Sequence, residues 1–331
     1  MAGATYVVGI SADFLPEDHA EGAPVALKFQ SVDLSPLTDN ERVQLKVVPV
    51  AGGVVPADGV AGCDALVLLS AKFTANSIPP DGRLAVVARF GVGYDSVDVA
   101  ACTAAGIAVT ITPDGVRRPV ATSILGFILA LSLKLVQKNR LARLGGEGFA
   151  QRASYMGEGL VGKKLGSIGL GNIGAEMFRL CKPLGMEFIA HDPYAKPGLA
   201  EDLGVTLVDL PTLFAQSDYL AVNCPLIPAT AKIVNSERLA TMKPTAYVIN
   251  TSRGGTVDQP ALAAALEAGT IAGAAIDVFD PEPPQPDDPI FSPSIGEKLI
   301  ATPHGICWTD ECFAGIGASA IASALTIMHG S

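Results

Sequence analysis

Two stretches of the sequence space their glycines as Gly-x-Gly-x-x-Gly, a pattern that can wrap a backbone turn around phosphate groups. The stretch from Gly157 to Gly162 follows the segment RASYM, which is a poor strand pattern, and precedes a strand instead of a helix. The stretch from Gly169 to Gly174 follows the strand pattern KKLGSIGL and precedes the helical pattern AEMFRLCKPLG. We therefore predict a turn-rich connector at the first stretch and a dinucleotide-binding turn at the second.

Each position of the second stretch has a physical task in such a turn. Gly169 permits the tight turn, Gly171 lets a pyrophosphate approach the backbone, and Gly174 lets the helix pack on the strand. The N–H groups of Asn172 and Ile173 are then expected to face the phosphates at the positive end of the helix.

An acidic residue is expected at the end of the next strand, and Asp192 stands there in the segment FIAHDPY. Its carboxylate would accept hydrogen bonds from the adenosine ribose hydroxyls and would repel a 2′-phosphate. The predicted cofactor is therefore NAD, with NADP disfavoured.

The composition limits the classes of protein that remain. A chain of 331 residues is long enough for two domains, and 49% apolar with 17% charged residues is typical of a folded globular protein. The net charge of -10, without a basic patch, argues against a nucleic-acid partner. The longest apolar run, from Val120 to Leu133, is too short and too rich in hydroxyl side chains to predict a membrane span.

The cysteines and the N-terminal segment bear on metal binding and on location. The six cysteines form no Cys-x-x-Cys pair and the histidines number four, so no metal site is predicted. The opening segment MAGATYVVGIS has no basic region followed by an apolar stretch, so we expect no signal peptide and a cytoplasmic protein with reduced thiols.

Strand and helix patterns alternate along most of the chain, which predicts an α/β protein with parallel, doubly wound sheets. The predicted strands are 6–10, 45–50, 65–69, 85–88, 107–111, 164–169, 187–191, 219–223, 246–250, 272–277 and 299–302. Helices are predicted after Gly174 to Leu184 and at 210–215, 236–241, 259–268 and about 310–328. A long helix is predicted from about Val120 to Leu144, because Arg118-Pro119 is a helix-start signal, and the stretch 13–42 reads as an irregular loop.

Four segments resemble those of the D-2-hydroxyacid dehydrogenases, the family of D-lactate, hydroxypyruvate and D-phosphoglycerate dehydrogenases. They are ARFGVGYDSVDV, KKLGSIGLGNIG, INTSRGGTVD with GAAIDVFDPEPP, and ATPHG, and they occur in the family's order and spacing. The similarity runs from about Ala65 to Ile321, while the first 60 residues match poorly. Jointly these motifs are specific, although each one alone is not.

The resemblance implies a catalytic triad of Arg253 in the Arg-Gly-Gly segment, Glu282 before a proline, and His304 in the Pro-His segment. Reduction of a 2-keto acid needs a proton for the carbonyl oxygen, and histidine exchanges protons near neutral pH. A neighbouring carboxylate orients the ring and favours imidazolium, while arginine binds the substrate carboxylate and keto oxygen. Taken singly, each residue reads more simply as a structural or solvated group, and only the joint pattern favours catalysis.

The family's remaining site residues are carried over in the same way. The N–H groups of Val92 and Gly93 are expected to hold the substrate carboxylate. Further cofactor contacts are implied for Cys224, Pro225, Thr251, Asp277 and His304. Cys307 is expected to be a wall residue instead of a nucleophile.

This sequence also departs from the family. Asn223 stands where the family usually has histidine, and Trp308 belongs to an unusual run after His304, which leaves the substrate open. Lys72 and Arg89 could assist an anionic substrate or serve the fold.

The resulting prediction is a two-domain protein with a cleft between the domains. Residues 1–117, completed by 304–331, form a flavodoxin-like substrate domain, and residues 118–303 form a Rossmann domain for NAD. The predicted function is hydride transfer between nicotinamide and a small D-2-hydroxy or 2-keto acid such as glyoxylate or hydroxypyruvate. The resemblance also implies a cytoplasmic homodimer that uses the Val120–Leu144 helix.

Three related functions remain as alternatives. Formate dehydrogenases share the scaffold but have glutamine at the position of Glu282, which counts against them. A phosphite dehydrogenase keeps the same triad. A non-catalytic NAD-sensing partner protein, similar to the family's transcriptional corepressors, keeps it too, although the chain shows no disordered tail of that kind.

Overall fold

A computed structural model describes residues 5–19 and 25–330, which form two compact units. Unit 1 comprises residues 1–119 and 308–331, and unit 2 comprises residues 120–307. The sequence predicted these boundaries after residues 117 and 303. Both units are built on a parallel sheet, so the prediction of two α/β domains is confirmed.

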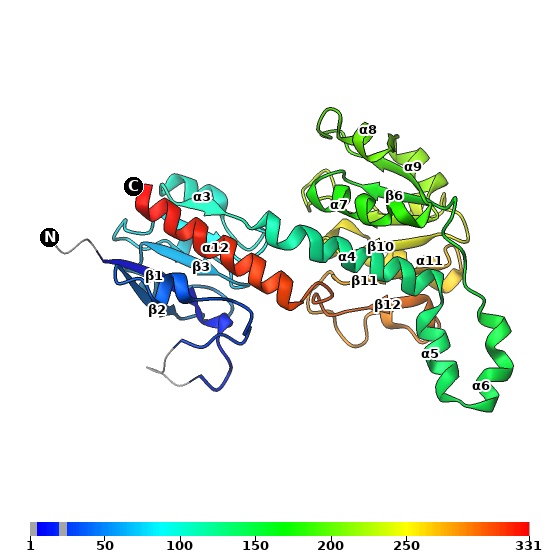
Figure 1. Cartoon of the computed structure of the whole chain (residues 1–331), viewed down its shortest axis with the longest axis horizontal. Helices are drawn as coiled ribbons and strands as arrows, with labels where there is room; N and C mark the ends of the chain where they lie inside the picture. Colours follow the sequence, from blue (N-terminus) through cyan, green and yellow to red (C-terminus); the bar gives the residue numbers. More distant parts are fainter. Residues whose placement is uncertain (1–4, 20–24, 331) are drawn as a thin grey trace. The chain divides into compact units, whose positions relative to one another are not determined.

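Unit 1 contains a five-stranded parallel sheet in the order β2-β1-β3-β4-β5, the flavodoxin-like order (Figure 1). The strands are β1 Tyr6–Ser11, β2 Val43–Val48, β3 Ala65–Leu68, β4 Val86–Arg89 and β5 Ala108–Thr110. Helix α12, Asp310–Gly330, packs against β3 and β4 from the far end of the chain. The other helices are η1 Ala12–Phe14, α1 Ser35–Thr38, α2 Ala57–Val60, η2 Ala75–Ser77 and α3 Val99–Ala104.

The central strands of unit 1 read as continuous apolar runs because both of their faces are covered. All four residues of β3 are buried, and two of them, Leu66 and Leu68, belong to one core cluster with Phe73 and Val87. The stretch 13–42 is mostly irregular, as predicted, apart from α1 and part of η1; its residues 20–24 lie outside the described residues.

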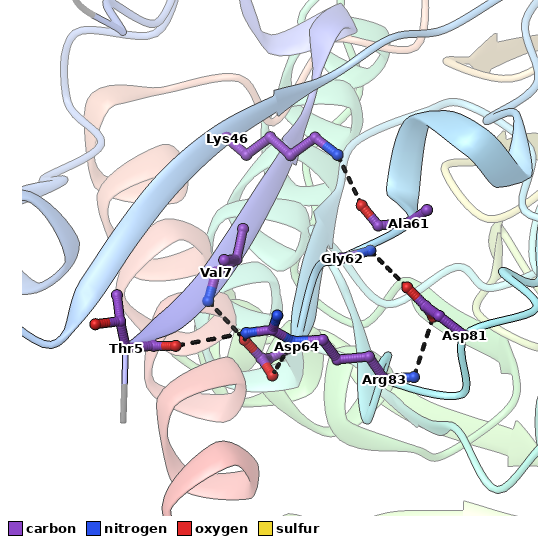
Figure 2. A network of polar contacts seen from close by, with 8 residues as sticks. All are labelled: Thr5, Val7, Lys46, Ala61, Gly62, Asp64, Asp81 and Arg83. Atoms are coloured by element: carbon purple, nitrogen blue, oxygen red, sulfur yellow. Dashed lines mark hydrogen bonds and ion pairs between the residues drawn. The ribbon is translucent and has the colours of Figure 1, made fainter. Parts of the chain in front are cut away.

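A polar network ties together the amino ends of three strands in unit 1 (Figure 2). Asp64, just before β3, accepts hydrogen bonds from the backbone N–H of Val7 at 2.6 Å and from Nε of Arg83 at 2.9 Å. Asp81 accepts hydrogen bonds from the N–H groups of Gly62 and Arg83. The network therefore fixes the loops that lead into β3 and β4.

Unit 2 contains a seven-stranded parallel sheet in the order β12-β11-β10-β9-β6-β7-β8. The strands are β6 Lys164–Ile168, β7 Glu187–His191, β8 Val205–Leu207, β9 Tyr219–Val222, β10 Tyr247–Asn250, β11 Gly273–Ile276 and β12 Leu299–Ala301. The strand order reverses between β6 and β9. At such a switch point the loops diverge to opposite faces and leave a crevice that can bind a ligand.

Helices cover both faces of this sheet (Figure 1). They are α7 Asn172–Cys181, η4 Lys182–Leu184, α8 Leu199–Leu203, α9 Leu210–Gln216, α10 Ser236–Leu239, η5 Gly254–Thr256 and α11 Gln259–Ala268, with η6 Pro289–Phe291 and η7 Gly296–Lys298 before β12. Asp209, Asn235 and Asp258 cap the N-termini of α9, α10 and α11 with their side chains.

The predicted long helix from Val120 to Leu144 is wrong in both its start and its continuity. Helix α4 runs from Pro113 to Ser132 and contains Pro119, so Pro113 is the proline that starts it. The helix stops where the carbonyl of Ser132 accepts the N–H of Glu158 at 2.8 Å instead of a helical donor. Lys134 then adopts a left-handed conformation with φ of 53°, and α5, Leu135–Arg143, leaves at an angle of 57°.

Within the described residues, no single helix is long and apolar enough to cross a membrane; only the bent pair α4 and α5 meets that test by length and composition. After α5 the chain forms α6, Gly146–Gln151, and η3, Arg152–Tyr155. The stretch from Gly157 to Gly162 is a connector without helix or strand, as predicted.

Candidate active site

The glycine turn of unit 2 lies at the switch point, between the end of β6 and the start of α7. Gly169 has a φ of 101°, and a Cβ on it would lie 2.8 Å from the carbonyl oxygen of Asn223. A Cβ on Gly174 would lie 2.6 Å from the carbonyl oxygen of Gly169, whereas one on Gly171 would meet nothing within 4 Å. The first and third glycines are therefore required by packing, and the second faces open space.

The amino end of α7 gives this turn its polarity. Asn172 and Ile173 are the first two residues of the helix, and the N–H of Ala175 is bonded to the carbonyl of Gly171 at 2.9 Å. The N–H groups before Ala175 have no acceptor inside the helix, so they are available to an anion.

Asp192 lies just after β7 with its carboxylate beside the glycine turn. Its Oδ2 accepts the N–H of Leu170 at 2.8 Å, and its Oδ1 accepts the N–H of Tyr194 at 2.8 Å. These two bonds fix the carboxylate of Asp192 beside the glycine turn.

Three charged side chains come together at the carboxyl ends of β10, β11 and β12. Nδ1 of His304 lies 2.5 Å from Oε1 of Glu282. Arg253 is close enough that its charge lowers the pKa of both His304 and Glu282. The structure therefore brings the three residues of the implied triad into one electrostatic cluster within unit 2.

The ion pair favours the charged form of both partners. The hydrogen bond that His304 donates to Glu282 raises the pKa of His304 above its ordinary value, against the opposing effects of burial and of Arg253. Burial alone would raise the pKa of Glu282, but the hydrogen bond and charge of His304 outweigh burial and lower it. Nε2 of His304 has no partner among the described residues, so one N–H of the imidazolium is available to a ligand.

The backbone around Arg253 leaves no room for a side chain at the next position. A Cβ on Gly254 would lie 1.8 Å from the carbonyl oxygen of Phe279, so this turn packs directly on the chain that follows β11. Asn250, which is buried at the end of β10, donates from Nδ2 to the carbonyl of Arg253 at 3.1 Å and accepts the N–H of Ser252 at 3.0 Å.

Asp277, only 3% exposed, holds the loop that carries His304. Its Oδ1 accepts three hydrogen bonds, from the hydroxyl of Thr302 at 2.5 Å, from the N–H of Gly305 at 3.0 Å and from the N–H of Ile306 at 3.1 Å. His304 has a left-handed φ of 50°, and its N–H bonds to the carbonyl of Asp277 at 2.8 Å. The resemblance implied a cofactor contact for Asp277, and the sequence analysis missed this supporting role; an Asp as the last residue of an otherwise apolar predicted strand was the available signal.

The remaining residues of the predicted cofactor site lie at the ends of β9 and β10. The carbonyl of Cys224 accepts the hydroxyl of Ser252, and burial raises the pKa of the Cys224 thiol to about 11. Pro225 follows Cys224, and Thr251 precedes Ser252. The side chain of Asn223 donates a hydrogen bond from Nδ2 to Oγ of Ser167 at 2.9 Å, a contact that the sequence did not indicate.

The predicted substrate loop belongs to unit 1, where it follows β4. The N–H groups of Val92 and Gly93 have no acceptor among the described residues. Arg89 donates from Nη1 to the carbonyl of Phe90, and Lys72 is exposed beside an isolated bridge to Val54. Among the described residues there is no group of three His, Cys, Asp or Glu side chains that could hold a metal ion.

The chain is similar in sequence to known proteins. Residues 125–305 match the model of the D-isomer specific 2-hydroxyacid dehydrogenase NAD binding domain. The chain is 38% identical over 254 residues to a glyoxylate reductase of Korarchaeum cryptofilum, covering 76% of each protein. It is 36% identical over 309 residues to a D-3-phosphoglycerate dehydrogenase of Synechocystis sp., covering 87% of this chain and 53% of that protein.

Solved structures are similar over the whole chain. A crystal structure described as a glyoxylate reductase from Paecilomyes thermophila has a TM-score of 0.79 at 25% identity, and the match covers 99% of this chain and 97% of that one. This chain spans about half the length of the D-3-phosphoglycerate dehydrogenases that it matches. The family model and the relatives together show that the chain belongs to the D-isomer specific 2-hydroxyacid dehydrogenase family.

Proposed function

We propose that the protein is an NAD-dependent oxidoreductase that interconverts a small 2-keto acid and its D-2-hydroxy acid, with glyoxylate and hydroxypyruvate as candidate substrates. The observation that carries the proposal is the Glu282–His304 pair at 2.5 Å, with Arg253 acting on both groups. Relatives named glyoxylate reductase, hydroxypyruvate reductase and D-3-phosphoglycerate dehydrogenase support the same chemistry.

The residues of unit 2 fit a dinucleotide. Gly171 leaves open space at the turn, the first N–H groups of α7 are available to a pyrophosphate, and Asp192 is held ready for ribose hydroxyls. The carboxylate of Asp192 also supports the preference for NAD over NADP, because a 2′-phosphate would be repelled. The bound cofactor would supply the hydride.

The roles of the triad follow from their charges. In the direction of reduction, Nε2 of protonated His304 donates its proton to the carbonyl oxygen of the substrate while Glu282 keeps the ring oriented. Arg253 binds the substrate carboxylate and polarises the keto oxygen with its planar fork of donors. The N–H groups of Val92 and Gly93 have no acceptor among the described residues, so this loop of unit 1 stays the predicted carboxylate-binding loop.

Absorbance of NADH at its nicotinamide band tests this proposal, with glyoxylate and hydroxypyruvate as substrates and NADPH in parallel. We expect turnover with NADH preferred, and we expect Arg253→Ala to lose about 100-fold or more in kcat/KM while still binding NADH. Full activity in Arg253→Ala would contradict the role of this arginine. NADH binding without turnover of any keto acid would favour phosphite-type chemistry or the non-catalytic sensor.

A homodimer is also proposed, through the exposed apolar side chains of α5, α6 and their flanks. Phe149 on α6 is 62% exposed and lines a cavity of about 670 Å³ with Leu133 and Met156. Such a patch is characteristic of an interface. A monomer in sedimentation at micromolar concentration would contradict the dimer.

A cytoplasmic location is proposed from the six free thiols, and a tagged chain found outside the cytoplasm would contradict it.

A further inference from the structure

A cavity of about 370 Å³ lies within unit 2 at the amino ends of β10, β11 and β12. Tyr247, Ala272 and Lys298 line it, and each stands at or just before the first residue of one of these strands. The triad follows the carboxyl ends of the same strands, so the cavity lies at the opposite end of the sheet from the candidate active site. Its volume is typical of small-molecule sites, and the proposed function does not use it.

Lys134 brings a positive charge to this cavity from the break between α4 and α5. Its Nζ donates to the hydroxyl of Tyr247 at 2.6 Å and lies 5.1 Å from the centroid of that ring. The half-buried Lys134 has a left-handed φ of 53°, a conformation that persists only where the surrounding structure holds it. Among the described residues this ammonium forms no ion pair with a carboxylate, so two of its three donors are available to a ligand.

The other charged side chains at the cavity already have partners. The carboxylate of Glu297 accepts Nε of Arg140 at 2.6 Å, which neutralises it. Nζ of Lys298 donates to the carbonyl of Leu266 at 2.7 Å, and the charge of Lys298 helps to lower the pKa of Glu267. Lys134 is therefore the lining charge that the described residues leave without a counter-ion.

Two tyrosine hydroxyls at the cavity each accept a hydrogen bond from a cation. The hydroxyl of Tyr247 accepts from Lys134, and the hydroxyl of Tyr155 accepts from Nη2 of Arg140 at 3.2 Å. The ring of Tyr247 is further fixed by stacking on Tyr219, with centroids 5.2 Å apart. Neither O–H group of the two lining tyrosines has an acceptor among the described residues. Because a hydroxyl that accepts from a cation becomes a stronger donor, the polar lining suits a ligand that accepts hydrogen bonds.

The rest of the lining is largely apolar. Leu131, Ile295 and Ile300 belong to it, together with alanine side chains and the faces of the two tyrosine rings. Such a surface gains from contact with a hydrocarbon body and gains nothing from a small hydrated ion. An inorganic anion would therefore use only part of this cavity.

We propose that the cavity binds a small organic anion that carries a carboxylate on an apolar or aromatic body. Lys134 and the hydroxyl of Tyr247, which are in contact with each other, donate to the carboxylate, and the apolar lining receives the body. The ligand then contacts both the break between α4 and α5 and the amino end of β10, so it stabilises unit 2. This inference does not depend on the proposed function.

Benzoate is the probe for this site, and benzamide is its neutral counterpart. Calorimetric titrations are made in an Arg253→Ala background, so that a carboxylate site at the triad does not contribute. We expect saturable binding of benzoate at millimolar concentration and binding of benzamide that is weaker by about tenfold or more. We expect Lys134→Met to weaken benzoate binding by about tenfold or more, and Tyr247→Phe to weaken it by a smaller factor.

Lys138→Met is the matched control for the lysine variant. It removes the same charge one turn further along α5, where the side chain is exposed and does not line this cavity. It should leave the affinity for benzoate within about twofold of the parent protein. The affinity of Lys134→Met for NADH should match that of the parent protein, which shows that unit 2 is folded.

Methyl signals of isoleucine-labelled protein locate the bound probe. Benzoate should shift the signals of Ile295 and Ile300, which line the cavity, with the same concentration dependence as the calorimetric titration. Absence of saturable binding would overturn the proposal. Equal affinities for benzoate and benzamide, or unchanged affinity in Lys134→Met, would overturn it as well.

Discussion

Each unit contains a short ion pair, and the two pairs lie at opposite ends of their sheets. In unit 1, Arg83 and Asp64 pair at 2.8 Å before strands β3 and β4 begin (Figure 2). In unit 2, His304 and Glu282 pair at 2.5 Å after strands β11 and β12 end. Both pairs join a carboxylate to a nitrogen cation, but the two carboxylates differ in their other hydrogen-bond partners.

The carboxylate of Asp64 is fully engaged. It accepts hydrogen bonds from Nε and Nη2 of Arg83 and from the N–H of Val7. Neither the guanidinium of Arg83 nor a backbone N–H can release a proton near neutral pH. Among the described residues, the carboxylate of Glu282 accepts hydrogen bonds from His304 and, at 3.3 Å, from the N–H of Phe279. Because its partner is a histidine, which can both hold and release a proton, and Nε2 of that histidine is available, this pair can exchange a proton with a ligand.

The comparison therefore assigns stability to the amino-end pair and chemistry to the carboxyl-end pair. This division agrees with the general rule that open α/β sheets bind ligands at the carboxyl ends of their strands. Changes to the amino-end pair should accordingly alter stability, and changes to the carboxyl-end pair should alter catalysis.

Replacing the proton donor should have the largest effect. His304→Asn removes the titrating group and keeps a polar side chain of similar reach, so we expect kcat for keto-acid reduction to fall by about 100- to 10,000-fold. The thermal unfolding temperature should change little, because the ring is partly exposed. Retention of more than a tenth of the activity would remove His304 from the role of proton donor.

Glu282→Gln should alter the pH dependence more than the maximal rate. The carboxylate raises the pKa of His304, so its loss lowers that pKa, and the alkaline decline of keto-acid reduction should move to lower pH. The rate deficit should accordingly be larger at mildly alkaline than at mildly acidic pH. An alkaline decline that moves to higher pH, or does not move, would contradict the effect of Glu282 on the pKa of His304.

The same pair should stabilise the fold in a defined pH window. The contribution of His304 is present below its ordinary pKa of 6.5 and is lost as pH rises through its raised folded value. The contribution of Glu282 is present above its ordinary pKa of 4.5 and is lost as pH falls through its lowered folded value. Unfolding of wild type and Glu282→Gln should therefore differ most between these two ordinary values.

Much of the sheet architecture could be predicted from the sequence, because buried parallel strands leave apolar runs between turn residues. Strand β7 and helix α11 have the predicted bounds. The short strand β8 was not predicted, since two of its three residues are exposed and three residues carry little periodicity.

The glycine turn could be predicted from the sequence because the local path of the backbone determines which residues must be glycine. Gly169 needs a positive φ and Gly174 needs close packing, and both needs follow from a strand–turn–helix path. The break after Ser132 was not readable, because it depends on a hydrogen bond from Glu158, which belongs to a connector 26 residues away. The triad was not derivable from spacing either, since its members meet only when β10, β11 and β12 align; the resemblance supplied it.

The smallest effect is expected at the pair that the comparison assigns to stability. Asp64→Ala leaves the N–H of Val7 without its acceptor and Arg83 without its carboxylate, so the free energy of unfolding should fall by about 1–3 kcal/mol. The kcat/KM for keto-acid reduction should stay within about twofold at a temperature where both proteins are folded, because the change lies at the amino ends of the strands. Arg83→Met is the matched control: it removes the ion pair but keeps the Val7 contact, and it should cost less. If Asp64→Ala lowered kcat as strongly as Glu282→Gln, the division between an amino end that stabilises and a carboxyl end that reacts would not hold for this protein.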